Sequence, residues 1–494
     1  MFKPNPLFTD GCVLRHGREI AVFGEADSGA RVKARLTDRE GVCLGAASGS
    51  AREGRFLLYL PPQEPAVGCV LTIVCGAETF RAEDVAVGEL WLAGGQSNME
   101  LPLMNADGGA EETAAHDDPL IRFFEVPKYA RFCPEGEEAF ARTRWQRVKP
   151  GEAGWVSAVA YWFAKRRRAD WPEMPIGVID CWWGGTSISC WLDEETLRQT
   201  AVGTAYLTSW EENARGVTMD MYLEAERRFT EDLAVWNKKV EEAKKQLPPD
   251  APWAAVEAIA GLCPWNPPAG PGSPYRPAGV IHTMLERVVP AALSGILYYQ
   301  GEEDTCRTDR YDLLMAQLIA LWRRRFGDGE LPFLFVQLPG WDGCGEPEAW
   351  ARLRWQQERV HRLVRGTGMA VALDVGDRAN IHPTDKRPVG ERLADEALRV
   401  ADGRPAPEAP RITGLCHRDG EIELRLSEPV TGNPIGFEIL DTEGGWTKAE
   451  ALLRDDRIIL PGDPLGIRYA WANYPETDLR SAAGLPLAPW IWPE

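Results

Sequence analysis

Ser97 stands in the run Gly94-Gly95-Gln96-Ser97-Asn98-Met99-Glu100, directly after the apolar residues Leu90-Trp91-Leu92-Ala93. An apolar run that ends in two glycines predicts a buried strand followed by a tight turn, with the serine at its tip. A serine nucleophile needs this setting, because its hydroxyl must be exposed beside backbone N–H groups that receive negative charge. A glycine-rich surface turn is the plain alternative for so short a motif.

Three further polar segments follow predicted strands. They are Trp182-Trp183-Gly184-Gly185-Thr186-Ser187 after 176–181, Gln300-Gly301-Glu302-Glu303-Asp304 after 295–299, and Asp374-Val375-Gly376-Asp377 with Ile381-His382-Pro383 after 369–373. Ligands bind at the carboxyl ends of the strands in an open parallel sheet. We therefore expect Ser97 and these three segments to meet at one edge of the sheet.

A serine hydroxyl becomes a good nucleophile when a base takes its proton. The chain has six histidines, namely His16, His116, His282, His361, His382 and His417. His382 is the expected base, because it alone lies in a loop just past a predicted strand end. We expect His282, together with Gln96 and Trp183, to line the substrate cleft, although a structural role for His282 is the plainer hypothesis.

Acyl transfer also needs hydrogen-bond donors for the tetrahedral oxyanion. The expected donors are the N–H groups of Ser97 and Gly185, with the Gln300 side-chain amide as a third. A carboxylate must orient the imidazole and stabilise its charged form. Four candidates for this acid lie close in sequence to the expected site, and the residues alone do not choose between them: Glu302, Asp377, Asp374 and Asp385.

The composition narrows the class of protein. The net charge of −19 argues against nucleic acid or an anionic membrane surface as the main partner. The sequence has no metal-ligand spacing, no P-loop and no dinucleotide fingerprint, so we expect no metal and no organic cofactor. The eleven scattered cysteines and the lack of an apolar signal segment favour a cytoplasmic protein.

A chain of 494 residues is expected to form more than one domain. Residues 1–87 alternate polar and apolar residues between turns, which predicts a small β-sandwich. Residues 88–404 alternate strand-like and helical patterns, which predicts a parallel doubly wound sheet. The expected strands are 89–93, 176–181, 295–299, 332–338 and 369–373, and the expected helices are 311–326, 348–365 and 386–400, with a helical insertion near 195–250 that contains 219–246. Residues 405–494 predict a C-terminal β-sandwich.

Four collinear blocks resemble the sialate O-acetylesterase family, within the SGNH hydrolase superfamily of carbohydrate acetylesterases. The blocks are Gly88 to Glu100, Trp183-Gly184-Gly185-Thr186 with Trp191, Gly295 to Glu302, and Ile381 to Ala394. The resemblance implies a flavodoxin-like, three-layer α/β core of SGNH type that carries β-sandwich elements. It also implies removal of O-acetyl groups from sugars without a cofactor, with Ser97 as nucleophile and His382 as base.

The chain departs from the wider superfamily at two positions. Many SGNH enzymes carry an aspartate three residues before the histidine, where this chain has Ala379, and an asparagine where it has Gln300. The first departure leaves the acid of the triad open between Glu302, which related esterases with a Gln-Gly-Glu block suggest, and Asp377.

The leading hypothesis is a serine carbohydrate esterase that acts on O-acetylated sialic acid. An acetylxylan or other plant-polysaccharide acetylesterase is the alternative within enzymes, and a non-catalytic glycan-binding protein is the alternative outside them. The residues do not identify the sugar, the position of its acetyl group or the oligomeric state.

Overall fold

A mostly parallel sheet forms the middle of the mixed α/β computed structural model, which describes residues 1–248, 253–343, 345–418, 420–454 and 456–493. Its strands lie in the order β10-β9-β11-β8-β12-β13-β14, and every neighbouring pair except β10 with β9 is parallel. The bounds are β8 Glu78–Gly95, β9 Asp118–Glu125, β10 Gln146–Val148, β11 Ile176–Trp182, β12 Gly295–Tyr299, β13 Phe333–Gln337 and β14 Thr367–Val371. Every residue of β11 to β14 is buried, as in a parallel sheet covered on both faces.

Two pairs of helices pack with this sheet. The first pair is α4 (Ala158–Asp170) with α11 (Arg387–Val400), and the second is α9 (Tyr311–Phe326) with α10 (Ala349–Leu363). The helices expected at 311–326, 348–365 and 386–400 are thus confirmed, with ends that move by at most two residues. Gly327 ends α9 in the left-handed conformation, at φ +72°, that favours glycine.

Strand β9 was not expected from the sequence, although it pairs with β11 near the expected site. The buried Arg122 interrupts its apolar run, and this guanidinium donates hydrogen bonds to the carbonyl oxygens of Gly11 (2.8 Å) and Asp84 (2.6 Å). A charged residue at a buried position breaks the apolar run by which a buried strand is predicted, so the pattern of 118–125 did not indicate a strand. The five strands that we expected are all present.

The N-terminal residues form two layers of strands. One sheet is β1-β3-β6, and the other joins β2, β4, β5 and β7 to the first half of β8. Their bounds are β1 Phe2–Pro4, β2 Val13–Arg15, β3 Ile20–Ala26, β4 Arg31–Thr37, β5 Cys43–Ser50, β6 Arg55–Leu60 and β7 Ala66–Cys75. Strand β8 continues without a break into the central sheet, so the boundary expected between 87 and 88 lies inside one strand.

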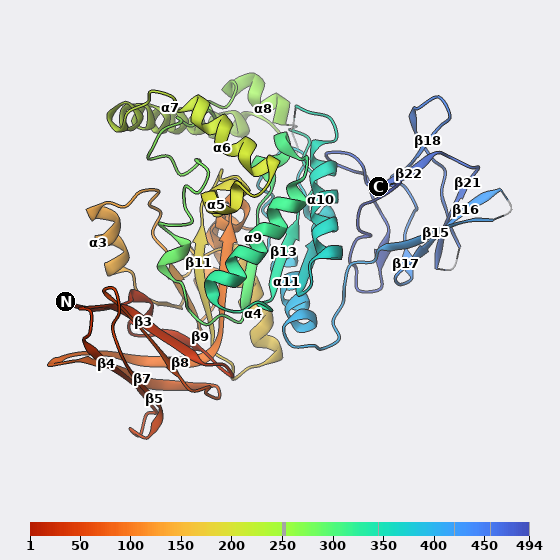
Figure 1. Cartoon of the computed structure of the whole chain (residues 1–494). Coiled ribbons are helices and arrows are strands. Elements are labelled where there is room, and N and C mark those ends of the chain that lie inside the picture. The colour runs from red at the N-terminus through yellow and green to blue at the C-terminus, as the bar shows by residue number, and fades with distance from the viewer. Residues whose placement is uncertain (249–252, 344, 419, 455, 494) are drawn as a thin grey trace.

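The helical insertion lies at the end of the molecule opposite the N-terminal strands (Figure 1). Its helices are α5 Glu194–Leu197, α6 Ala201–Asn213, α7 Met219–Gln246 and α8 Trp253–Ala260. The helix expected at 219–246 is confirmed, whereas α8 lies beyond the expected bounds of the insertion. Residues 249–252 lie outside the described residues. Over the described part of the chain, no helix has the length and apolar character needed to cross a membrane.

Three shorter helices precede the insertion, and ten short strands follow α11 in the part of the chain that the structure describes. The helices are α1 Ser97–Glu100, α2 Gly109–Ala115 and α3 Pro134–Arg142. The strands are β15 Ile412–Arg418, β16 Glu421–Leu426, β17 Val430–Thr431, β18 Phe437–Leu440, β19 Trp446–Lys448, β20 Leu452–Arg454, β21 Arg457–Pro461, β22 Gly466–Tyr469, β23 Arg480–Ser481 and β24 Trp490–Trp492. They pair as two four-stranded sheets, β15-β16-β21-β20 and β19-β18-β22-β24, and one two-stranded sheet, β17-β23.

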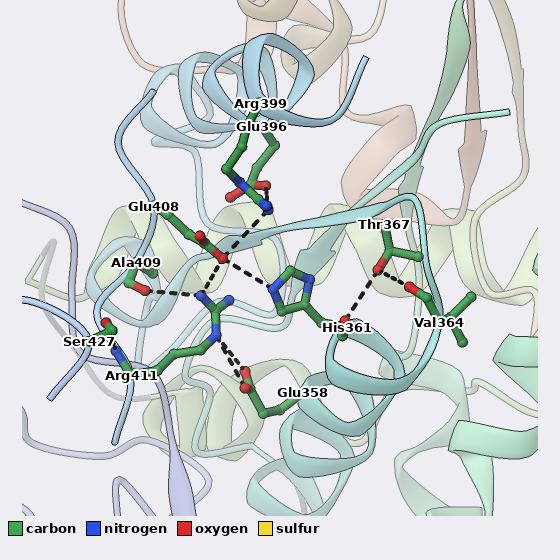
Figure 2. Close-up of polar contacts among 10 residues, drawn as sticks. All are labelled: Glu358, His361, Val364, Thr367, Glu396, Arg399, Glu408, Ala409, Arg411 and Ser427. Atoms are coloured by element: carbon green, nitrogen blue, oxygen red, sulfur yellow. Dashed lines mark hydrogen bonds and ion pairs between the residues drawn. The ribbon is translucent and has the colours of Figure 1, made fainter. Parts of the chain in front are cut away.

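An ion-pair network attaches the segment after α11 to the helices of the core (Figure 2). Arg411 pairs with Glu358 of α10 at 3.2 Å and with Glu408 at 2.7 Å, and Glu408 also lies 3.2 Å from His361 Nε2. Burial alone would raise the pKa of Glu408, but the hydrogen bond from His361 and the charges of Arg411 and Arg399 lower it to about 2. The network fixes the start of the C-terminal strands against α10 and α11, two helices that pack with the sheet.

Candidate active site

Strand β8 delivers Ser97 to the carboxyl edge of the sheet through one tight contact. Gly95 has φ +127°, and a Cβ there would lie 2.1 Å from the Tyr299 carbonyl oxygen of β12. The next residue, Gln96, donates its N–H to the same oxygen at 2.9 Å. Helix α1 then begins at Ser97, so glycine is required at 95 for the serine to turn out of the sheet.

The side chains of Ser97 and His382 meet across 285 residues of sequence. Ser97 Oγ lies 2.7 Å from His382 Nε2, within hydrogen-bond distance. Asn380 supports the histidine loop, because its Oδ1 accepts the His382 N–H at 3.0 Å and its Nδ2 donates to the His382 carbonyl at 2.7 Å. Asn98, the residue after Ser97, donates to the Ile381 carbonyl at 3.0 Å, which joins the two loops directly.

The surroundings of His382 keep its imidazole neutral. Burial, together with the nearby ammonium groups of Lys386 and Lys244, lowers the pKa of His382 to about 4. Burial also lowers the pKa of Lys386 to about 7, and its Nζ donates to Asn98 Oδ1 at 2.5 Å. A neutral imidazole in contact with a serine hydroxyl is the protonation state that a general base requires.

The second polar segment lies against Ser97. A Cβ on Gly184 would lie 3.3 Å from Ser97 Cβ, and the Gly184 N–H donates to Glu100 of α1 at 2.7 Å. The next residue, Gly185, has φ +73°. Among the described residues, the N–H groups of Ser97 and Gly185 have no protein acceptor, and the Ser97 N–H belongs to the first turn of α1. Both are free to donate to a bound oxyanion.

The structure contradicts the expectation that Gln300 is a third oxyanion donor. Gln300 is 1% exposed, and its Nε2 faces three protein acceptors: Asp304 Oδ2 at 2.5 Å, Gln96 Oε1 at 3.1 Å and the Thr186 carbonyl at 3.2 Å. Its Oε1 accepts the Tyr311 hydroxyl at 2.8 Å. An amide nitrogen has two hydrogens, so Gln300 has no donor left for a ligand. Its role is to join the polar segments.

Gln96 is oriented by these contacts. Its Oε1 accepts hydrogen bonds from Gln300 Nε2 at 3.1 Å and from the N–H groups of Gly301 and Glu303, both at 3.3 Å. Its Nε2 has no protein acceptor in the described part of the chain. The expected contact between Gln96 and substrate therefore stays a prediction, and the donor that would make it is available beside Ser97.

The expected carboxylate partner of His382 is not found where the sequence places it. Glu302 Oε1 accepts from Asn98 Nδ2 at 2.6 Å, and Asp377 Oδ1 accepts the N–H groups of Ala379 and Asn380. The two further candidates are Asp374, which pairs with Arg392 and Arg480, and the exposed Asp385. Within the described residues, none of these four carboxylates bonds to His382. They build the loops around the histidine and leave its ring in contact with Ser97.

Trp183 and His282, which were both expected to contact substrate, lie in different parts of the structure. Trp183 is partly buried at the end of β11, and its N–H donates to the Gly95 carbonyl at 3.1 Å, so it lies in the second polar segment. His282 lies between Glu286 at 3.1 Å and Glu194 at 3.2 Å, and it lines a separate cavity beside the N-terminal strands. The structure does not bring His282 together with Ser97 and His382, and its two carboxylate partners favour the structural role that the sequence also allowed.

A cavity of about 530 Å³ opens beside Gly185. The insertion contributes Tyr206 and Trp210 to its wall, the third polar segment contributes Glu303, and Arg307 follows three residues after the end of that segment. Burial and the neighbouring Asp304 carboxylate raise the pKa of Glu303 to about 7. Among the described residues, no group of three or more His, Cys, Asp or Glu side chains is placed to hold a metal ion.

Comparisons with known proteins identify what this chain is similar to. Residues 264–399 match the family model of a carbohydrate esterase, the sialic acid-specific acetylesterase. The chain is 26% identical to mouse sialate O-acetylesterase, over 92% of this chain and 86% of that protein, and 25% identical to the human enzyme, over 92% and 84%. A carbohydrate acetylesterase from Xanthomonas citri superposes over 99% of both chains with a TM-score of 0.76 and 27% identity. The resemblance to the sialate O-acetylesterase family is confirmed.

The substrate side of this sialate O-acetylesterase-like site contains residues that sequence analysis missed. A Cβ on Gly185 would lie 2.2 Å from the indole of Trp265, and the ring of Trp265 packs edge-on against Tyr275 at 5.7 Å. Both residues come from the stretch 251–278, in which tryptophan, proline and glycine are frequent. That aromatic content was the available signal, but it does not show which strand end the loop covers.

Proposed function

We propose that this chain is a serine carbohydrate esterase that removes O-acetyl groups from sugars, with O-acetylated sialic acid as its substrate. The observation that carries the proposal is the 2.7 Å contact between Ser97 Oγ and His382 Nε2 beside two free N–H groups. The mouse and human relatives are sialate O-acetylesterases, and the matching structure is a carbohydrate acetylesterase, which supports the substrate class.

The proposed reaction begins when His382 Nε2 accepts the Ser97 proton and Ser97 Oγ attacks the acetyl carbonyl carbon. The carbonyl oxygen becomes an oxyanion, for which the N–H groups of Ser97 and Gly185 are the donors, with Gln96 Nε2 as a third. The tetrahedral intermediate collapses, the C–O bond to the sugar breaks, and His382 gives its proton to the leaving sugar oxygen. Water then attacks the acetyl-serine with His382 as base, and acetate leaves.

The proposal gives His382 no carboxylate partner in the free enzyme. Asn380 and Asn98 hold the backbone of its loop, and burial keeps the ring neutral. These contacts fix the main chain that carries the ring, and the ring itself is held by the contact of its Nε2 with Ser97 Oγ, so they serve one of the two tasks of the acid in a triad. The other task, stabilising the charged imidazole, is left to the polar surroundings and to the oxyanion that forms beside it.

The test is acetate release from a panel of O-acetylated sialic acids and acetylated xylo-oligosaccharides. Wild-type protein is expected to release acetate from sialic acids, and Ser97→Ala to lose at least about 10³-fold in kcat/KM while it keeps the wild-type circular dichroism spectrum. Preferred hydrolysis of the xylo-oligosaccharides would instead identify a plant-polysaccharide acetylesterase. Binding without acetate release would identify a glycan-binding protein.

We further propose that the core belongs to the SGNH type, with β-sandwich domains at residues 1–87 and 405–494. Ser97, a glycine of the second polar segment and His382 correspond to three of the four blocks, and Gln300 replaces the asparagine of the fourth. A crystal structure in which the strand order or the Ser97–His382 contact differs would contradict this assignment.

The thiols favour a reducing compartment, and we propose the cytoplasm. The cysteines of the described residues are free, and Cys12, Cys69, Cys181 and Cys190 are buried. Burial raises the pKa of Cys12 to about 12, so this thiol acts as a small apolar side chain. Disulfides in protein isolated from cells without a reductant, measured by thiol titration, would contradict the proposal.

A further inference from the structure

Arg307 lines the cavity beside Gly185 without an acidic partner. Its guanidinium lies over the ring of Tyr206, 4.8 Å from the centroid, and donates to Ser209 Oγ at 3.2 Å. Among the described residues, no carboxylate oxygen lies within 4.0 Å of it. Arg307 is exposed to solvent, and in a chain with a net charge of −19 a cation in the wall of this cavity can attract an anionic ligand.

The nearest acid in the cavity does not neutralise this cation. Glu303 lines the same wall, and burial raises its pKa to about 7, which weakens its negative charge at neutral pH. Asp304, one residue further on, is fully buried and accepts hydrogen bonds from the Ile188 N–H at 2.8 Å, from Gln300 and from the Tyr206 hydroxyl. Arg307 interacts electrostatically with both acids but forms an ion pair with neither, so its guanidinium donors stay accessible from the cavity.

The rest of the cavity suits a sugar. Its wall contains the amides of Asn213 and Asn266, which can donate to and accept from hydroxyl groups, and the aromatic rings of Trp210 and Tyr275. A volume of about 530 Å³ lies within the usual range for small-molecule sites. The cavity begins at Gly185, one of the proposed oxyanion donors, and the preceding residue, Gly184, lies against Ser97, so the cavity adjoins the proposed nucleophile.

We propose that Arg307 binds the carboxylate of an acidic sugar and so makes the site selective for O-acetylated sialic acids over neutral acetylated sugars. The proposal rests on the proposed esterase function of Ser97. The planar guanidinium donates two parallel hydrogen bonds to a carboxylate, and the ring of Tyr206 and the hydroxyl of Ser209 hold it in place before the ligand binds. A neutral sugar would leave this cation without its partner.

The experiment compares Arg307→Ala with wild type on three substrates: an O-acetylated sialic acid, the methyl ester of the same compound, and an aryl acetate. The expected loss in kcat/KM on the free acid is about 10- to 100-fold, mainly through KM, which is the range for charge-assisted hydrogen bonds. The methyl ester and the aryl acetate should change by less than about threefold, because neither presents a carboxylate. Arg307→Lys is expected to recover part of the loss.

Arg227→Ala is the matched control, because it removes an exposed arginine of the same insertion that pairs with Glu224 and Glu231 away from the cavity. It should leave all three rates unchanged. Equal losses on the free acid and the methyl ester in Arg307→Ala would overturn the assignment, since the residue would then act on the fold and not on the carboxylate.

Binding of free sialic acid to Ser97→Ala, measured by calorimetry, separates this assignment from the proposed function. Ser97→Ala should bind sialic acid, and the double variant with Arg307→Ala should bind it at least about 10-fold more weakly. Equal affinities would overturn the role of Arg307 even if the wild type is an active esterase. If the wild type released no acetate but its binding of sialic acid still depended on Arg307, the proposed esterase function would be overturned and the carboxylate-binding role of Arg307 would stand.

Discussion

The low pKa of His382 predicts an esterase that stays active in acid. Burial, with the charges of Lys386 and Lys244, lowers this pKa to about 4 from the ordinary value near 6.5. The neutral imidazole is the active form, so activity is lost as the pH falls through the pKa of His382. The acid limb of kcat/KM reports this pKa in the free enzyme.

At pH 5 the lowered pKa of His382 has a large effect on the fraction of the imidazole that is neutral. A histidine with a pKa of about 4 is about 90% neutral there, whereas one with a pKa of 6.5 would be only about 3% neutral. The rate at pH 5 should therefore be close to its value at pH 7. The assay is acetate release from a neutral aryl acetate between pH 3.5 and 8, because the charge of such a substrate does not change in this range.

Lys386→Met removes the second-largest cause of the shift. The loss of a positive charge near the ring should raise the pKa of His382, so the midpoint of the acid limb should move to higher pH. Arg387→Met is the control, since this neighbouring side chain is exposed and pairs with Glu391. An acid limb centred near 6.5 in the wild type, or no movement in Lys386→Met, would refute the electrostatic account of the base.

Further predictions concern the oxyanion donor, the histidine loop and the C-terminal attachment. Gly185→Ala should lower kcat/KM by about 10²-fold, because a Cβ there would lie 2.2 Å from Trp265 and would displace the N–H; an unchanged rate would exclude this donor. Asp377→Asn should leave kcat/KM within about threefold, since its carboxylate bonds only to its own loop, and a loss above about 10³-fold would restore it as the acid. Arg411→Ala should lower the free energy of unfolding by about 2–4 kcal/mol in a denaturant titration, because Glu358 loses its partner while 5% exposed (Figure 2); a change below about 0.5 kcal/mol would contradict this.

The parts of the fold that repeat a simple period could be predicted from the sequence. The helix at 311–326 and the buried strands at 176–182 and 295–299 could be predicted from the spacing of their apolar residues, because this spacing reflects which side chains are buried. Strand β9 could not be predicted in this way, since it buries Arg122 against backbone oxygens of the turn at Gly11 and of the first half of β8.

The pairing of Ser97 with His382 could be predicted because both follow parallel strands of one sheet, whose carboxyl ends share an edge. The role of Gln300 could not, because its amide is taken up by Asp304, Gln96 and Thr186 through contacts that depend on side-chain packing. Arg307 was missed for the same reason: nothing in its local sequence shows that the insertion closes a cavity around it.

Covalent labelling by a serine-directed organophosphate tests the central assignment most directly. Intact mass spectrometry should show one adduct per chain, and peptide mapping should place it on Ser97, with acetate release lost in proportion to labelling. His382→Ala should label much more slowly, because the hydroxyl then lacks its base. Full acetylesterase activity in a protein that carries no adduct at Ser97 after prolonged exposure to excess reagent would contradict the account.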